Sequence, residues 1–359
     1  MLRRHLRVWL LIAVVVVLGG AYLYVGTRIY DELSVVHAGC DGRWQGQTPA
    51  NFSVGGVDMT GLRMPGYEDV RIPSRDPGVT LSSWFVPSAV ANAPAVVVVH
   101  GMNSCKREAR ILLAAGLLHR HGFSVLLMDM RNHGDSTVQN GHYAGGTKEY
   151  RDVLGAWDWL VSTSGLSPHH VGLMGFSLGA ATVLIATGEE QRVAATWEDS
   201  SYAEVGETIR AELARKGYPT WLEYAGYTAA RIESGDDLTT LSPAGAMAKL
   251  NGRPVFITHG TADQRLSVTY ANELAADTRA AGGTVDPWIV PGSGHIDAIV
   301  GHTDEYEQRL VAFFDSTIGT PAGDCPRAFV ARAWPADRLR ACQASPPRRR
   351  RSANPSSGI

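Results

Sequence analysis

Six short apolar runs, rich in β-branched residues, recur along the chain, and stretches of helical pattern lie between most of them. A strand that is apolar at nearly every position must be buried on both faces, as in a parallel sheet that helices cover on both sides. Two further runs, Val70–Ile72 and Val79–Val86, flank a turn-rich segment and predict an opening pair of strands. The sequence therefore predicts an α/β fold with a mostly parallel, doubly wound sheet and helices on both faces. The six runs are residues 95–99, 125–128, 171–174, 194–197, 255–258 and 284–290.

One of these runs leads into a turn that carries a serine between two glycines. The pentapeptide Gly175-Phe176-Ser177-Leu178-Gly179 follows the run 171–174 and precedes a helix-like stretch at 180–186. A tight turn from strand to helix lifts its central side chain clear of the sheet, and it needs flanking positions with little side chain. Ser177 is therefore the candidate nucleophile. The alternative is a structural turn with an incidental serine, since a short glycine pattern also arises by chance in a chain with 39 glycines.

A serine hydroxyl needs a base to accept its proton, and the base needs an acceptor that holds its tautomer. Asp263 follows the run 255–258, and His295 follows the run 284–290. Because the carboxyl ends of parallel strands meet at one edge of a sheet, we expect Ser177, Asp263 and His295 to converge there. The alternative bases are His259, which we expect to orient the turn at Asp263, and His302, and the alternative acids are Asp199 and Asp286.

Attack on a carbonyl group also requires hydrogen-bond donors for the oxyanion that forms. The backbone N–H of Leu178 lies at the expected start of a helix, where the helix dipole favours negative charge. The backbone N–H of Met102, in the loop His100-Gly101-Met102-Asn103 after the run 95–99, is the second candidate donor. An ordinary strand-to-helix turn is the alternative interpretation of that loop.

Together these motifs resemble those of the α/β-hydrolases over roughly residues 65–318. The matching segments are 100–102, the D-x-R-x-H-G-x-S loop at 129–136, 175–179, 259–263 and 294–295. The resemblance implies an α/β-hydrolase fold and an acyl-enzyme mechanism on an ester, thioester or amide, with a carboxylic ester as the first expectation and no cofactor. The 129–136 loop and a short cap are most similar to the BEM46-like membrane-anchored serine hydrolases and their bacterial relatives.

Three other functions remain open at this point. The same acyl-enzyme could transfer its acyl group to an acceptor of the cell envelope, which would make the protein an acyltransferase. A serine peptidase is a weaker alternative, because we find no propeller or other large domain before the catalytic part. The third alternative is a non-catalytic binding module, although no member of the expected triad is missing.

Composition restricts the partners. The chain has 359 residues, of which 45% are hydrophobic and 19% charged, as in a well-packed globular protein, and its net charge is −2. Without a basic excess, nucleic acid is not an expected partner. No C-x-x-C motif or His/Cys cluster predicts a metal site. The expected ligand is a small-molecule or lipid-like acyl substrate.

The N-terminus contains a separate apolar segment. Residues 8–25 include no charged side chain, and as a helix they would span about 27 Å, close to the thickness of a bilayer core. Arg3, Arg4 and Arg7 precede this run, so the positive-inside rule places residues 1–7 in the cytoplasm and the rest of the protein outside. The segment is interpreted as an uncleaved signal anchor. A cleaved signal peptide, which would release a secreted protein, and a buried core helix are the alternatives.

The remaining segments divide the chain as follows. Residues 26–55 lack periodicity and are expected to form a stalk, and residues 56–318 are expected to form the catalytic domain. Within this domain, about residues 203–250 are expected to form a small helical cap over the site, in which the aromatic residues contact either substrate or core. Residues 319–359 form a Cys-containing, Pro- and Arg-rich tail that is expected to be largely disordered.

Export permits disulfides, and the four cysteines allow three complete pairings that the sequence does not rank. Cys105 lies beside the expected active-site loop, whereas Cys40, Cys325 and Cys342 lie outside the catalytic core. We therefore expect a bridge among these last three cysteines and a free thiol at Cys105.

Overall fold

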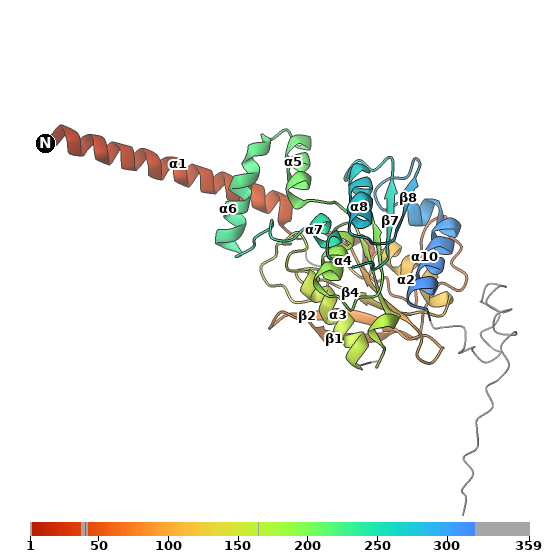
Figure 1. Ribbon diagram of the computed structural model, residues 1–359. Helices are drawn as coiled ribbons and strands as arrows, with labels where there is room; N and C mark the ends of the chain where they lie inside the picture. Colours follow the sequence, from red (N-terminus) through yellow and green to blue (C-terminus); the bar gives the residue numbers. More distant parts are fainter. Residues whose placement is uncertain (1, 37–39, 41, 164, 320–359) are drawn as a thin grey trace, which may run out of the picture. The chain divides into compact units, whose positions relative to one another are not determined.

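A computed structural model describes residues 2–36, 40, 42–163 and 165–319. Within these residues the strands form one sheet in the order β1-β2-β4-β3-β5-β6-β7-β8. Strands β1 and β2 lie at one side of this sheet, and β7 and β8 lie at the other (Figure 1). The first two strands pair antiparallel with each other, β2 pairs antiparallel with β4, and all other neighbours are parallel. The strands are β1 (Glu68–Pro73), β2 (Thr80–Val86), β3 (Ala95–Val99), β4 (Ser124–Met128), β5 (Val171–Phe176), β6 (Thr196–Asp199), β7 (Val255–Gly260) and β8 (Val285–Val290).

This sheet confirms the predicted doubly wound α/β fold. Each of the six apolar runs forms a parallel strand, and the two opening runs form β1 and β2. The run expected at 194–197 is displaced, because the strand covers Thr196–Asp199. Its pairing with β7 begins at Val255, directly after Pro254, whose missing N–H cannot extend the ladder.

Helices cover both faces of the sheet. Along β3, Val97 and Val99 face one fully buried core, while Val96 and Val98 face the other, as the two-residue period of a strand requires. Helices α3 (Tyr150–Thr163), α4 (Leu178–Glu189), α7 (Pro243–Met247) and α8 (Thr269–Ala280) contribute to the first core. Helices α2 (Ala109–Arg120), α9 (Ala298–Gly301) and α10 (Thr303–Thr317) contribute to the second. Short 3-10 turns are η1 (Gly42–Trp44), η2 (Pro168–His170) and η3 (Thr220–Leu222).

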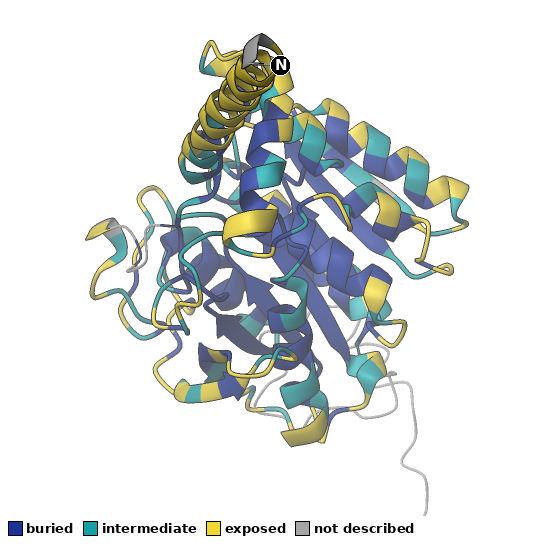
Figure 2. Ribbon diagram, turned by 90° about the vertical axis from the view of Figure 1, so that its left-hand side faces the viewer, coloured by how far each residue is buried: buried dark blue, intermediate teal, exposed yellow. Residues whose placement is uncertain are grey.

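Helix α1 (Leu2–Ser34) extends beyond the apolar run 8–25 at both ends. Residues 4–24 are exposed, whereas Gly26, Ile29 and Tyr30 are buried against the domain (Figure 2). Among the described residues it is the one helix that is long and apolar enough to cross a membrane. Residues 26–34, assigned above to the stalk, therefore continue the helix and pack against protein.

The second half of the expected stalk also packs against the domain. Phe52 is fully buried and belongs to the same core as Leu62, Met64 and the apolar face of α2. Gly116 of α2 permits this approach, because a Cβ atom there would lie 2.6 Å from the carbonyl oxygen of Leu62. Phe52 is a core residue because it packs against distant residues of the chain. The residues around it show no hydrophobic periodicity, so the sequence does not indicate its burial.

Helices α5 (Val205–Arg215) and α6 (Glu223–Glu233) follow β6. Together with η3 they account for most of the expected cap. Helix α6 packs against the C-terminal part of α1 (Figure 1). At this crossing Gly26 is in contact with the carbonyl group of Ala225, and a larger residue would not fit.

Candidate active site

Ser177 lies at the junction of β5 and α4, in a conformation that few non-glycine residues adopt. Its backbone φ is 54° and its ψ is −117°. The N–H of Ser177 donates to the carbonyl oxygen of Asp199 at 2.8 Å, which fixes the turn to the neighbouring strand β6. Strain of this kind persists only where the surroundings over-determine the conformation, and here it holds the hydroxyl above the sheet edge.

The two glycines of the pentapeptide permit this turn. A Cβ atom at Gly175 would overlap the carbonyl group of Gly179, and one at Gly179 would overlap the carbonyl oxygens of Val99 and His100. The start of α4 can therefore lie directly against the end of β3. This packing explains why the predicted motif requires glycine at both positions.

The structure places His295 and Asp263 beside Ser177. Nε2 of His295 lies 2.8 Å from Oγ of Ser177, and Nδ1 lies 2.7 Å from Oδ2 of Asp263. Asp263 follows β7, His295 follows β8, and Ser177 follows β5, so the side chains meet at the carboxyl edge of the sheet. The side chain of Asp263 is inaccessible to solvent, whereas 20% of the His295 side chain is exposed.

The Asp263 carboxylate has hydrogen-bond donors around both of its oxygens. Oδ1 accepts from the backbone N–H groups of Arg265 and Leu266 at 2.8 and 2.9 Å. Burial alone would raise the pKa of Asp263, but hydrogen bonds from His259 and His295 hold the pKa well below its ordinary value. The carboxylate is therefore ionised at every pH at which a histidine can act as a base.

His259 does not reach the serine, although the sequence offers it as an alternative base. Its Nε2 donates to the carbonyl oxygen of Leu266 at 3.1 Å and lies 3.3 Å from Oδ2 of Asp263. Burial lowers the pKa of His259, but the hydrogen bond to Asp263 and the charge of Glu198 outweigh it and raise the pKa above its ordinary value. The expectation that His259 orients the turn at Asp263 agrees with these contacts.

The other alternative residues have different partners. Oδ1 of Asp199 accepts from Oγ of Ser200 at 2.8 Å, and Oδ2 accepts from the hydroxyl of Tyr306 at 2.9 Å. Burial raises the pKa of Asp199 to about 6, against the opposing effect of these two hydrogen bonds. His302 lies at the start of α10, and its ring contacts Trp288. The side chain of Asp286 is outside the part of the chain that the structure describes.

Ser200 also belongs to the site, although no motif in the sequence marks it. Its Oγ accepts from the backbone N–H of Ile296 at 3.3 Å while donating to Asp199. It thereby connects the end of β6 to the loop that carries His295. Ser200 adopts a positive φ of 62°, and no pattern in the sequence indicates that strained conformation.

The loop after β3 lies against the serine. A Cβ atom at Gly101 would lie 3.2 Å from Cβ of Ser177, so the backbone approaches the serine closely at this point. Nε2 of His100 accepts from the N–H of Met130 at 3.1 Å, so Nδ1 carries the proton and donates to the carbonyl oxygen of Gly101 at 2.7 Å. Burial lowers the pKa of His100, which keeps the ring neutral. Since Gly101 C=O and Met102 N–H belong to one peptide plane, this bond also orients the N–H of Met102.

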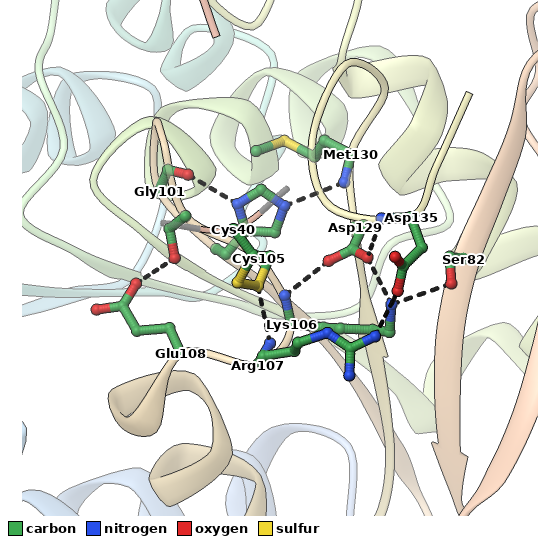
Figure 3. The surroundings of a disulfide bond; sticks show 12 residues. Cys40, Ser82, Gly101, Cys105, Lys106, Arg107, Glu108, Asp129, Met130 and Asp135 are labelled. Carbon is green, nitrogen blue, oxygen red and sulfur yellow. Dashed lines mark hydrogen bonds and ion pairs between the residues drawn. A yellow bond between two sulfur atoms is a disulfide. The ribbon is translucent and has the colours of Figure 1, made fainter. Parts of the chain in front are cut away.

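A disulfide between Cys40 and Cys105 fixes the end of the same loop (Figure 3). The expectation of a free thiol at Cys105 is therefore wrong. The backbone N–H of Val36 donates to the carbonyl oxygen of Gly141 at 2.8 Å, and this pairing turns the chain after α1 back onto the domain. The Cα atoms of the two cysteines are then 5.3 Å apart, within the range that a disulfide spans. Cys325 and Cys342 lie outside the described residues.

The D-x-R-x-H-G-x-S loop at 129–136 supports this region, and none of its residues lines the cleft at Ser177. Oδ1 of Asp129 accepts from the backbone N–H of Lys106 at 2.7 Å, and Oδ2 accepts from its Nζ at 2.5 Å (Figure 3). The Lys106 ammonium is buried and also donates to Oγ of Ser82 at 3.0 Å. Arg131 makes a second buried ion pair with Asp152. A buried charge is costly without such partners, so these pairs hold the loop in one arrangement.

A cleft of about 810 Å³ opens at Ser177. Its lining includes the serine, His295, the loop 101–104, Arg265 and the segment 53–55. Of the described residues that line it, none belongs to 203–250, because α5 and α6 pack toward α1. Trp44 and residues 53–55, which follow α1 in the chain, line the cleft instead. Within the same described residues, no three His, Cys, Asp or Glu side chains are grouped as metal ligands.

Several known proteins and one protein family are similar to this chain. Residues 113–321 match the model of the prolyl oligopeptidase family. An uncharacterized protein of Mycobacterium tuberculosis is 28% identical over 246 residues, which cover 68% of this chain and 78% of that protein. The thiohydrolase aneE of Aspergillus aculeatus is 37% identical over 103 residues, 29% of this chain and 32% of that protein. The polyketide transferase af380 of Aspergillus fumigatus is 25% identical and covers 68% of this chain and 97% of its own length.

The solved structures with a similar fold include an esterase. The esterase Pf2001 of Pyrococcus furiosus superposes with a TM-score of 0.59 at 21% identity, covering 75% of this chain and 99% of that one. This likeness confirms the predicted α/β-hydrolase fold. The narrower resemblance to the BEM46-like group stays a prediction.

Proposed function

Because the chain belongs to the prolyl oligopeptidase family, a family of hydrolases, we propose that it is a serine hydrolase that cleaves a carboxylic ester, thioester or amide through an acyl-enzyme. The observation that carries this proposal is the hydrogen-bonded series Ser177, His295 and Asp263, with contacts of 2.8 and 2.7 Å. This arrangement is the one that activates a serine hydroxyl for attack on a carbonyl group.

In the first step Oγ of Ser177 attacks the carbonyl carbon while its proton passes to Nε2 of His295. The carbon–oxygen double bond becomes an oxyanion, which the N–H groups of Met102 and Leu178 stabilise. Leu178 is the first residue of α4, so its N–H has no acceptor within the helix and the helix dipole favours the negative charge. The proton on His295 then passes to the leaving alcohol, thiol or amine as the bond to the acyl carbon breaks.

In the second step a water molecule attacks the acyl-enzyme. His295 accepts a proton from the water, and the new tetrahedral species collapses to release the acid and return the proton to Ser177. Asp263 remains ionised throughout and stabilises the imidazolium form of His295. No cofactor takes part in this scheme.

The direct test uses a p-nitrophenyl ester with the wild-type protein and Ser177→Ala. We expect the wild type to turn the ester over and Ser177→Ala to abolish that turnover. A fluorophosphonate probe should label the wild type and leave Ser177→Ala unlabelled. Retained turnover in the variant would overturn the assignment of the nucleophile, and an unlabelled wild type would favour a non-catalytic binding module.

Acyl transfer is the second candidate function, and the relative named polyketide transferase favours it. The acyl-enzyme is the same, and the acceptor is an alcohol or amine in place of water. Product analysis in the presence of candidate acceptors distinguishes the two functions, because a transferase forms the new ester or amide at the expense of the free acid. A peptide nitroanilide tests the peptidase alternative in the same assay format.

We further propose that α1 anchors the protein in a membrane, with residues 1–7 in the cytoplasm and the catalytic domain outside. Support comes from the exposed apolar segment 8–24, the arginines that precede it and the Cys40–Cys105 disulfide, which an oxidising compartment favours. Extraction with alkaline carbonate should leave the chain in the membrane, and intact mass should show residues 1–25 still present. A shortened chain in the medium would show the cleaved, secreted alternative.

A further inference from the structure

Helix α6 carries a stripe of exposed side chains that the proposed chemistry does not use. Trp221, in the turn η3 just before α6, is 62% exposed, Tyr224 is 62% exposed and Ile232 is 66% exposed. Together with the half-buried Thr228 they follow one another at intervals of three, four and four residues, so they share one side of the helix. Large apolar side chains gathered on an exposed helix face indicate a contact with a membrane or another molecule.

The contacts between α6 and α1 show which way this stripe faces. Ile29 of α1 contacts the position of Gly226, on the side of α6 away from the stripe. Tyr22, two turns nearer the N-terminus, reaches Thr228 of the stripe, with 3.5 Å between its hydroxyl and Oγ1. The stripe therefore faces the N-terminal part of α1.

That part of α1 is the segment that we propose to lie in lipid. Its side chains from residue 4 to residue 24 are exposed, and burial against protein begins at Gly26. Helix α6 crosses α1 where the exposed apolar segment ends (Figure 1). A bilayer that surrounds residues 8–25 has its outer surface at this crossing.

We propose that Trp221, Tyr224 and Ile232 form a membrane-contact surface that inserts into the interfacial region of the bilayer that α1 spans. This inference rests on the proposed membrane anchoring. Trp and Tyr are the residues that favour the headgroup region, because each combines an apolar ring with a polar group. The lipid surface is the occupant that the structure favours, because the stripe adjoins and faces the exposed apolar length of α1.

The second attachment has a mechanical consequence. A single helix leaves the domain free to rotate about the helix axis and to tilt away from the surface. A contact through α6 removes this freedom and holds the cleft at Ser177 in one orientation relative to the membrane.

The test uses the full-length protein in lipid vesicles that contain brominated lipids, with bromine placed near the headgroup or deep in the acyl chain. A Trp9→Phe background removes the tryptophan of the α1 apolar segment. The difference in emission between this background and the same protein with Trp221→Phe reports on Trp221. We expect the shallow bromine to quench Trp221 more than the deep bromine does. The matched control is Trp159→Phe on α3, whose ring packs against Phe85 of β2, and we expect neither lipid to quench that emission.

Emission from Trp221 that neither lipid quenches would overturn the membrane-contact surface. An unquenched Trp221 in an oligomer that Trp221→Ser dissociates would assign the stripe to a second copy of the chain, with the same consequence. Ser177→Ala should leave the quenching unchanged, and Trp221→Phe should leave turnover of a soluble ester in detergent unchanged. Failure of the proposed chemistry is thereby distinguishable from failure of this surface.

Discussion

His259 and Asp263 make a buried contact behind the candidate triad, with Nε2 of His259 3.3 Å from the same Oδ2 atom that binds His295. Neither side chain of this pair is accessible to solvent. The Asp263 carboxylate therefore lies between two imidazoles, one buried and one at the cleft. Its orientation depends on His259 and on the backbone N–H groups of Arg265 and Leu266.

We expect His259→Gln to lower kcat for a p-nitrophenyl ester by about tenfold or less, since it weakens one hydrogen bond worth about 1 kcal/mol. Asp263→Asn should lower kcat by about 10³- to 10⁴-fold, because the carboxylate that stabilises the imidazolium is lost. The matched control is His302→Gln, at the start of α10, which should leave kcat unchanged. An equal loss in His259→Gln and Asp263→Asn would contradict a merely orienting role for His259.

The close packing at the turn of Ser177 predicts that one added methyl group at Gly179 destabilises the fold. Gly179→Ala should lower the free energy of unfolding by about 1–3 kcal/mol, because its Cβ atom would overlap backbone oxygens at the end of β3. Gly301→Ala in α9 is the control, since no atom lies within 4 Å of its Cβ position, and it should change stability by about 0.5 kcal/mol or less. Urea denaturation of both variants measures the difference. Similar midpoints would mean that the start of α4 can move away from β3.

The Cys40–Cys105 disulfide should stabilise the fold. It closes a loop with a sequence separation of 65 residues, for which the chain-entropy model gives about 4 kcal/mol as an upper value. Cys40→Ser and Cys105→Ser should each lower the melting temperature by the same amount, and the double variant should lower it no further. A native protein in which a maleimide modifies Cys105 without reductant would refute the pairing.

Glu198 predicts a pH-dependent stability. Burial raises the pKa of this side chain from its ordinary value of 4.5 to about 8. Between these pH values the folded state binds more protons than the unfolded state, so the free energy of unfolding falls as the pH rises through this window. In the wild type, the backbone N–H of Ser201 donates a hydrogen bond to Oε2 of Glu198 at 2.9 Å. Glu198→Gln removes the titrating group and keeps an oxygen that can accept this hydrogen bond. The melting temperature of the variant relative to wild type should therefore rise from about pH 5 to about pH 9, and parallel curves would contradict this expectation.

Local patterns were sufficient for the sheet and for the residues brought to its edge. Strands such as 95–99 and 171–174 are apolar at each position because both faces are buried, and this condition is visible in the sequence itself. The glycines around Ser177 are visible in the sequence because the tight turn leaves no room for a side chain at these positions. Asp263 and His295 are recognisable because each follows a predicted strand. The structure brings these side chains within hydrogen-bond distance, and their catalytic roles stay predictions until the variants are measured.

The sequence by itself determined the α/β fold, the elbow at Ser177 and the apolar helix at the N-terminus, since each depends on neighbours within one strand, turn or helix. Only the tertiary structure decided that Cys105 pairs with Cys40, that Phe52 joins the core and that α6 packs on α1 away from the cleft. These arrangements depend on contacts between segments far apart in the chain. Their energy comes from burial and bonding between the two partners, and neither partner carries a local period that would reveal the other.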